Sequence, residues 1–371
     1  MKKFLVLMLS TVLFFSGCEK KNTQNGNARK TIKIGAILPE SHKDFSSYAK
    51  QLKKGMMLAN ELINKDNNIT LNIVYEDGFG IPNKSISAMK KLIDIENPKL
   101  IIGPMFSHTA ESLVPIAQKT KTILLSPTAS SIKLSEAGKY FFRIYPSDSY
   151  DGTFLANFIN HKFKNKTVAI LAENTSSINQ IVNVFKENLQ NKIIYEEKFN
   201  ENVLNNALST VVTKIKELSP DVIFFPGNKT FMTMFLKKVK EHNLKSNFIT
   251  ISTFNDKKIL DKTKETSENV IFSTPAFNPK SNTEEMEIFV KEYKKKYNED
   301  PDILAGYGYD VANIAYKALK QSSNIDESIK NLLAIKDYLG ITGKTTFKSN
   351  GDVDKTLQMM SVKNGKFIAY E

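Results

Sequence analysis

The sequence contains few of the residues that build metal centres, disulfides and covalent catalytic sites. Its 371 residues include one cysteine and four histidines. The histidines, at positions 42, 108, 161 and 242, do not fall at the spacings of metal ligands, so we expect no metal ion. A lone cysteine cannot form an intramolecular disulfide, and stability must therefore come from the hydrophobic core.

Motifs that carry catalysis are also missing. The sequence has no Gly-x-Ser-x-Gly motif and no glycine-rich phosphate-binding loop. The acidic pair Glu76-Asp77 follows a predicted strand, where adjacent side chains point to opposite faces and make a poor acid–base couple. His108 directly follows Ser107, but serine–histidine couples are assembled from distant segments. We therefore expect neither an enzyme nor a cofactor.

The charge is predominantly of one sign. Lysine and arginine number 52 against 39 acidic residues, which gives a formal net charge of +13. The excess is lysine spread along amphipathic segments, without concentrated arginine and without a basic block interleaved with aromatic residues. This distribution predicts a solvated lysine-rich surface and no nucleic-acid partner.

The first thirty residues have the pattern of an export signal. Lys2 and Lys3 precede an apolar run, Phe4–Phe15, that is too short to span a bilayer. Ser16-Gly17-Cys18 then resembles the bacterial lipobox, in which the cysteine is acylated, although Phe15 stands where leucine is usual. We expect a signal peptide over 1–17, a lipid on Cys18 and a polar tether over 18–30, with the protein exported and anchored on the periplasmic or cell-surface side of a bacterial membrane. The alternative is a chance cysteine, which would normally lie in a core.

Length and periodicity predict two α/β lobes. A chain of 371 residues with 41% hydrophobic and 25% charged residues is too long for one ordinary core. Apolar strand patterns alternate with amphipathic helix patterns, which indicates doubly wound sheets. In the first unit the strands are 31–38, 71–75, 100–102 and 122–125, and the helices are 48–64 and 83–95. In the second unit the strands are 167–171, 193–199, 222–225 and 248–252, and the helices are 178–189, 204–218 and 231–239.

Two hydroxyl-rich loops follow neighbouring strands of the first unit. Gly103-Pro104 and Ser107 follow the strand at 100–102, and the segment Ser126–Ser131 follows the strand at 122–125. Adjacent parallel strands place both loops at the carboxyl edge of the sheet, where backbone N–H groups and helix N-termini favour an anion such as a carboxylate. Helix caps and turns are the simpler explanation of each loop taken alone.

These loops resemble those of the leucine/isoleucine/valine-binding type of extracellular solute-binding protein. The segments IKIGAILP (32–39), ANELIN (59–64), VYEDGFGIP (74–82), IGP (102–104) and SPTAS (126–130) occur in the order typical of that family, and the similarity continues over almost everything after residue 31. The resemblance implies a type I periplasmic binding protein fold, with two Rossmann-like lobes joined by crossover hinge strands and a ligand cleft between them. It places 31–146 and 278–334 in the first lobe, and 147–277 and 335–371 in the second.

The same resemblance implies the function and the partners. A protein of this kind captures an amino acid or a related carboxylate for a branched-chain-amino-acid-type ABC importer, closes its lobes over that solute, and docks on an ABC permease as a monomer. The residues that it implies for ligand binding are Tyr48, Ser107, His108, Thr128, Ala129, Ser130 and Ser252.

Two departures from the family pattern leave the ligand open. Ser176-Ser177-Ile178 stands where amino-acid binders carry Tyr-Gly, and Ser252 stands where they carry an acid for the ligand ammonium, with Asp256 as the alternative acid. Carboxylates without an ammonium, amides and peptide fragments therefore remain candidates. A second hypothesis is a lipoprotein with a degenerate cleft that binds a protein partner, as activators of cell-wall synthases do.

Overall fold

Five parallel strands form the first sheet, in the order β2-β1-β3-β4-β5. They are β1 (Lys30–Leu38), β2 (Ile69–Asp77), β3 (Leu100–Ile102), β4 (Ile123–Ser126) and β5 (Phe141–Arg143). The inner strands β3 and β4 are buried along their whole length, as parallel strands covered on both faces must be. The helices of this lobe are α1 (Ser46–Asp66), α2 (Pro82–Lys91), α3 (Ser107–Thr120), α9 (Glu284–Tyr297), α10 (Ile303–Leu319) and α11 (Ile325–Leu333).

Seven strands form the second sheet, in the order β15-β14-β10-β9-β8-β6-β7. They are β6 (Val168–Glu173), β7 (Ile193–Phe199), β8 (Val222–Phe224), β9 (Asn247–Thr250), β10 (Ile271–Pro275), β14 (Leu357–Lys363) and β15 (Lys366–Ala369). Strands β14 and β15 are antiparallel to their neighbours and the others are parallel. The helices of this lobe are α4 (Asp148–Lys162), α5 (Ser176–Asn188), α6 (Leu204–Leu218), α7 (Lys229–Glu241) and α8 (Lys257–Thr263).

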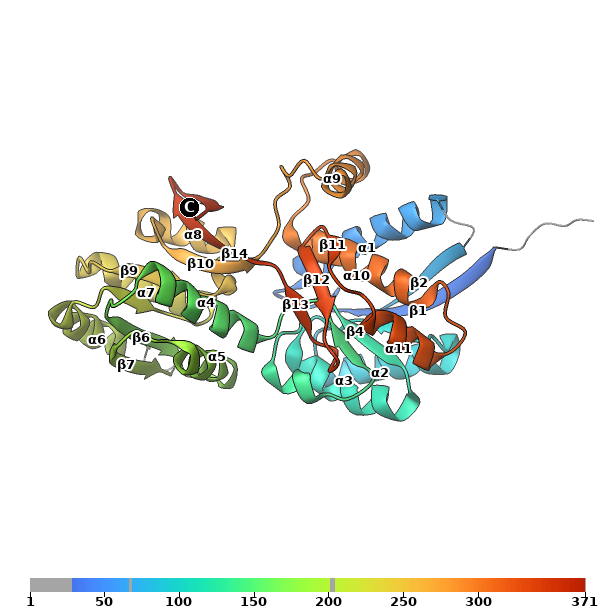
Figure 1. Cartoon of the computed structure of the whole chain (residues 1–371), viewed down its shortest axis with the longest axis horizontal. Coiled ribbons are helices and arrows are strands. Elements are labelled where there is room, and N and C mark those ends of the chain that lie inside the picture. The colour runs from blue at the N-terminus through green and yellow to red at the C-terminus, as the bar shows by residue number, and fades with distance from the viewer. Residues whose placement is uncertain (1–28, 67–68, 201–203, 371) are drawn as a thin grey trace, which may run out of the picture.

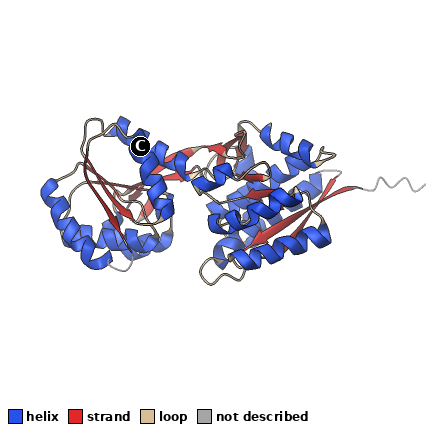
Figure 2. Ribbon diagram, turned by 90° about the horizontal axis from the view of Figure 1, so that it is seen from below, coloured by secondary structure: helices blue, strands red, loops and turns tan. Residues whose placement is uncertain are grey.

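Each sheet has its own hydrophobic core, so the protein consists of two lobes. The computed structural model describes residues 29–66, 69–200 and 204–370. Figure 1 shows the lobes side by side, and Figure 2 shows the extended segments that join them. Among the described residues the chain crosses between the lobes after β5, after β10 and between β13 (Val353–Lys355) and β14. The predicted α/β fold with two doubly wound lobes and crossover strands is confirmed.

The segment between α11 and β14 lies elsewhere than predicted. Strands β11 (Tyr338–Gly340), β12 (Gly343–Phe347) and β13 form a small antiparallel sheet. Phe347 and Val353 are buried in the core of the first lobe, whereas the predicted boundary put 335–371 in the second. Only the hairpin β14–β15 joins the second sheet. The reason is that this segment turns back onto β5, where Phe142 packs against Phe347.

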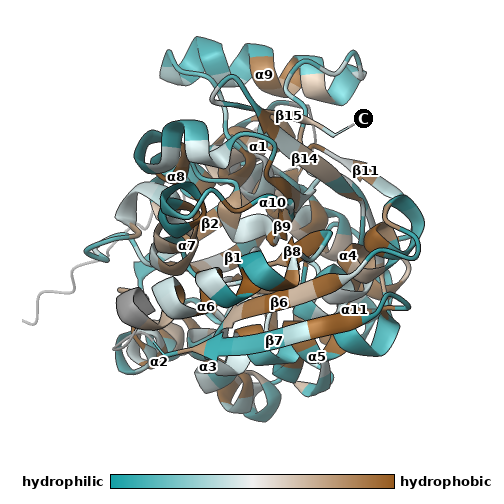
Figure 3. Cartoon of the chain, turned by 90° about the vertical axis from the view of Figure 1, so that its left-hand side faces the viewer, coloured by the Kyte–Doolittle hydropathy of each residue, from teal (hydrophilic) through white to brown (hydrophobic). Residues whose placement is uncertain are grey.

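Polarity is distributed as the lysine-rich composition predicts. Figure 3 shows hydrophobic residues gathered on inner strands such as β6 and β8, and hydrophilic residues over the outside of helices α8 and α9. Within the part of the chain that the structure describes, no helix combines the length and apolarity needed to cross a bilayer. The predicted signal peptide, Cys18 and residues 18–28 of the tether lie outside the described residues.

Helices α1 and α10 cross in direct backbone contact inside the first lobe. A Cβ atom on Gly308 would lie 1.9 Å from the carbonyl oxygen of Leu52, and one on Gly55 would lie 1.9 Å from that of Ala305. Both contacts are with backbone atoms, which cannot rotate away. Two glycines, one on each helix, therefore fix the crossing that seats α10 on the first lobe.

We expect Gly308→Ala to destabilise the first lobe, because the added methyl group must push the two helices apart. Overpacking of this kind costs roughly 1–3 kcal/mol. Thermal denaturation followed by circular dichroism should show an earlier first transition for Gly308→Ala. Lys50→Ala, at an exposed position of α1, is the control and should melt as the wild type does. Equal melting temperatures for Gly308→Ala and the wild type would show that the crossing can relax.

Candidate ligand cleft

A cavity of about 350 Å³ lies between the two lobes. Its first-lobe wall comes from loops that follow β3, β4 and β5 and from the start of α1, and its second-lobe wall comes from α4, α5 and the turn after β9. Both walls thus include the carboxyl ends of parallel strands, where ligands of doubly wound folds bind. Of the seven residues predicted for ligand binding, Tyr48, Thr128, Ser130 and Ser252 line the cavity.

Ser107, at the first position of α3, holds the second hydroxyl-rich loop in place. Its Oγ accepts the backbone N–H groups of Ser130 and Ser131, each at 3.1 Å. The N–H of Ala129 is bound in the same way by Ser126 Oγ, at 3.0 Å. These N–H groups were predicted to be free for an anion, but they are used to shape the loop. Ser107 and Ala129 therefore position the loop rather than line the cavity, and the hydroxyl of Ser107 keeps its own hydrogen for a further acceptor.

Thr128 and Ser130 present the side chains of that loop to the cavity. Thr128 Oγ1 donates to the carbonyl of Met105 at 2.7 Å, which ties this loop to the one after β3. The Ser130 hydroxyl hydrogen-bonds to the carboxylate of Asp148, and the carbonyl of Ser130 accepts the N–H of Asp148 at 2.8 Å. The loop is therefore fixed to the start of α4, on the opposite side of the first crossover.

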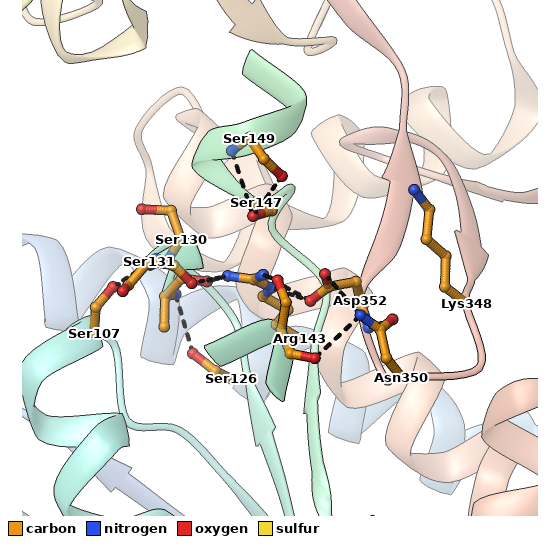
Figure 4. Close-up of polar contacts among 12 residues, drawn as sticks. Ser107, Ser126, Ser130, Ser131, Arg143, Ser147, Ser149, Lys348, Asn350 and Asp352 are labelled. Atoms are coloured by element: carbon orange, nitrogen blue, oxygen red, sulfur yellow. Dashed lines mark hydrogen bonds and ion pairs between the residues drawn. The ribbon is translucent and has the colours of Figure 1, made fainter. Parts of the chain in front are cut away.

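Behind the loop lies a buried arginine that the sequence reading missed. Arg143 on β5 is fully buried, and its guanidinium meets Asp352 Oδ1 through Nε at 2.7 Å and through Nη2 at 2.6 Å. Nη1 donates to the carbonyl of Ser131 at 2.8 Å (Figure 4), and Nη2 donates to Ser135 Oγ at 2.8 Å. Burial lowers the pKa of Arg143, and Asp352 opposes that shift. A charged residue inside the apolar run Phe141–Ile144 was the available signal, since a buried charge requires a partner.

Tyr48 on α1 connects the first lobe to the second. Its hydroxyl donates to Asp256 Oδ2 at 2.6 Å and accepts from Lys229 Nζ at 2.5 Å, while Lys229 also pairs with Asp256. Burial acts to raise the pKa of Asp256, but the hydrogen bonds from Lys229 and Tyr48 outweigh it and lower that pKa. Asp256, the predicted alternative partner for a ligand ammonium, is therefore already paired with a cation. We call these three residues the interlobe triad.

His108 lies outside the cavity wall. The residue is exposed, its Nε2 lies 3.1 Å from the carbonyl oxygen of Gly80, and its ring stacks on Phe106. Phe106 and Phe45 line the cavity in its place, with ring centroids 5.1 Å apart. Two aromatic rings, and not the His108 imidazole, therefore form this part of the cavity wall.

The second-lobe wall carries two carboxylates that the sequence reading also missed. Asp148 and Asp151 both line the cavity from the first turn of α4, and Ser252 lies next to them, with its Oγ 3.2 Å from the hydroxyl of Tyr145. Burial raises the pKa of Asp148, and it raises that of Asp151 to about 7. Two acids three residues apart share one face of a helix, but no helix was predicted from the sequence where α4 begins, so this spacing carried no signal. Among the described residues no three potential metal ligands converge.

Comparison with known proteins gives one consistent result. The family model described as "Periplasmic binding protein" matches residues 31–366. A leucine-, isoleucine-, valine-, threonine- and alanine-binding protein of Pseudomonas aeruginosa is 22% identical over 355 residues, which cover 93% of this chain and 90% of that protein.

Solved structures with the same fold bind different acids. The branched-chain amino acid transporter substrate binding protein LivJ of Streptococcus pneumoniae, in complex with isoleucine, is similar with a TM-score of 0.78 at 25% identity, covering 92% of this chain and 98% of that one. A solute binding protein of an ABC transporter from Rhodopseudomonas palustris, in complex with 3,4-dihydroxybenzoic acid, has a TM-score of 0.72 at 20% identity, covering 90% and 93%.

We expect Tyr48→Phe to weaken lobe closure, because it removes the hydroxyl that joins the lobes in the interlobe triad. A hydrogen bond to a charged group contributes roughly 1.5–3 kcal/mol. Spectroscopic distances between labels on the two lobes should become longer and broader in Tyr48→Phe. Tyr195→Phe is the matched control, because the Tyr195 hydroxyl donates to Glu197 within the second lobe, at 2.9 Å. If both variants keep the wild-type distance, the triad does not hold the lobes together.

Proposed function

Because the chain belongs to the periplasmic binding protein family, whose model matches residues 31–366, we propose that it is the lipid-anchored, extracytoplasmic solute-binding protein of an ABC importer. Its solute is a small molecule that carries a carboxylate, such as an amino acid or an analogue. The lobes close over the solute, and the closed form docks on the permease. The observation that carries this proposal is the cavity between the lobes, which has the dimensions of a small-molecule site.

The hydroxyl-rich loop supports the carboxylate part of the proposal. Thr128 and Ser130 place hydroxyl groups on the cavity wall, and the Ser107 hydroxyl behind them retains a hydrogen that it can donate. No lysine or arginine lines the described cavity, so these hydroxyl groups would hold the carboxylate. Each hydroxyl has one hydrogen, which Thr128 donates to the Met105 carbonyl and Ser130 to the Asp148 carboxylate, so each would turn from that partner to the solute on binding. Isoleucine and 3,4-dihydroxybenzoic acid, which are bound by two proteins of the same fold, share only their carboxyl group.

Closure of the lobes would strengthen the binding of the solute. The crossovers at Tyr145-Pro146, Pro275 and Leu357 all reach the cavity, so a rotation about them changes its shape directly. Closing the cavity excludes water, which strengthens each hydrogen bond to the solute. The solute shifts the equilibrium to the closed form only by as much as it binds that form better than the open one.

We expect a thermal-shift screen of the full chain in detergent to identify the solute among amino acids, small carboxylates, amides and short peptides. A ligand at one hundred times its dissociation constant stabilises the folded state by about 2.7 kcal/mol, which is a shift of several degrees. Ser130→Ala should weaken the best ligand about two- to tenfold, because it removes one hydroxyl group from the cavity. Ser87→Ala, at an exposed position of α2, should leave the affinity unchanged. A folded sample that responds to no member of the panel would favour a protein partner instead.

We expect Cys18→Ser to release the protein from the membrane fraction of a bacterial host. Cys18 is the only cysteine, so a palmitate analogue supplied to the cells should label the wild type and not the variant. Ultracentrifugation of the lysate then separates anchored from free protein. Equal labelling of the two proteins would contradict lipidation at this residue.

A further inference from the structure

The cavity between the lobes has the opposite charge to the rest of the protein. Lysine and arginine outnumber acidic residues by 52 to 39 in the chain, yet Asp148 and Asp151 are the only carboxylate, lysine or arginine side chains that line the described cavity. Two cations close to the cavity are already paired: Lys229 with Asp256 at the interlobe triad, and Arg143 with Asp352 behind the loop. Among the described residues no lysine or arginine forms an ion pair with either carboxylate, although the charge of Arg143 acts to lower the pKa of Asp148.

The described hydrogen bonds to both carboxylates come from neutral donors. Asp151 is 8% exposed, and its Oδ1 accepts from Ser273 Oγ at 2.5 Å. The backbone of Ser252 also hydrogen-bonds to Asp151. Asp148 Oδ2 accepts from Ser177 Oγ at 3.2 Å, and the Ser130 hydroxyl bonds to the same residue. A buried carboxylate without a cation is unfavourable, and a positively charged group of a ligand would remove that penalty.

Aromatic rings complete the surroundings of a cation. Phe45 and Phe106 line the first-lobe side of the cavity, and Tyr145 lines it at the first crossover. Tyr48 lines it too, but Lys229 Nζ already lies 4.9 Å from the centroid of its ring. Ring faces attract ammonium groups within about 6 Å, and the attraction is stronger when water is excluded. The wall that carries the acids and the wall that carries the rings come from different lobes, so closure would bring both onto one group.

We propose that the cleft selects solutes that carry a positively charged amino group, and that Asp151, together with Asp148, is the residue that determines this selectivity. This inference rests on the proposed function, because it names the chemical class of solute for the same cleft. It places the acid for the amino group on α4, whereas the sequence pattern pointed to Ser252 or Asp256. Ser130 bonds to Asp148 and lies in the hydroxyl-rich loop, so the carboxylate and amino sites adjoin.

The release of a proton when the solute binds would be a second sign of this assignment. Burial, and then the neighbouring charge of Asp148, raise the pKa of Asp151 to about 7, while the hydrogen bond from Ser273 opposes the shift. The other titratable group that faces Asp151 is Tyr145, which stays neutral because burial raises the pKa of its phenol. An ammonium group favours ionised Asp151, so binding releases a proton, and affinity should fall as the pH is lowered from 8 to 6.

The sign of the stability effect follows from the same shift. The pKa of Asp151 in the folded protein lies above its ordinary value, so folding disfavours the ionised carboxyl. The resulting destabilisation grows as the pH rises from about 4 to 7 and is complete above 7. Without ligand, Asp151→Asn should therefore melt at or above the wild-type temperature at pH 8. A residue with a purely structural role would show a loss of stability instead.

The test uses the full chain in detergent and pairs of solutes that differ only in the α-amino group. Suitable pairs are L-norleucine with hexanoate and L-phenylalanine with 3-phenylpropanoate, titrated by calorimetry in two buffers of different ionisation enthalpy. We expect the amino member of a binding pair to bind at least about tenfold more tightly and to release protons near pH 7. In Asp151→Asn this preference should fall at least about tenfold, and the proton release should disappear.

Asp148→Asn provides a second variant should Asp151→Asn fail to fold, and Asp261→Asn, at an exposed position of α8, is the control for the loss of one charge. The inference is overturned if a carboxylate without an amino group binds as tightly as its partner, or if both variants keep the wild-type preference. Binding of the simple carboxylates alone would leave the proposed function intact. Failure of every solute to bind would overturn the proposed function and this inference together.

Discussion

The buried pair of Arg143 and Asp352 is the interaction on which the geometry of the cleft depends. The Arg143 guanidinium is fully buried and donates to Asp352, Ser131 and Ser135. This one side chain therefore joins the end of β5, the hydroxyl-rich loop and the turn before β13. A buried ion pair contributes little net stability, but removal of one partner leaves an uncompensated charge. The pair therefore specifies where the loop sits, and it ties two of the three crossovers to the first lobe.

The sequence was sufficient for the fold and the family because both are encoded locally. Buried strands such as Leu100–Ile102 are short apolar runs ended by glycine and proline, and the order of such runs predicted the doubly wound lobes that the structure shows. The predicted resemblance to periplasmic binding proteins, and with it the absence of an enzymatic role, is confirmed by the family match. Ser107 and the loop at 126–131 were also predicted to meet, because adjacent parallel strands end at the same edge.

The parts that could not be predicted depend on contacts between distant segments. Tyr48 and Asp256 are 208 residues apart, and no local pattern indicates that Asp256 pairs with Lys229 instead of facing a ligand. Asp151 on α4 and Ser273 on β10 are 122 residues apart, so their proximity follows from the packing of α4 against β10 within the second lobe. His108 was assigned to the site through its neighbour Ser107, but successive residues at a helix start point in different directions, and its ring faces Gly80.

The direction of β1 has a mechanical consequence under the lipid attachment that we propose at Cys18. The chain enters the first lobe at Lys30, at the amino end of a nine-residue strand, whereas the cavity lies beyond the carboxyl ends of the same sheet. At about 3.3 Å per residue, the strand alone separates the two by roughly 30 Å. Under the proposed attachment, the second lobe would rotate about the crossovers while the amino end of β1 stays fixed. A force on that end of the chain would act on the first lobe and would not oppose closure over a solute.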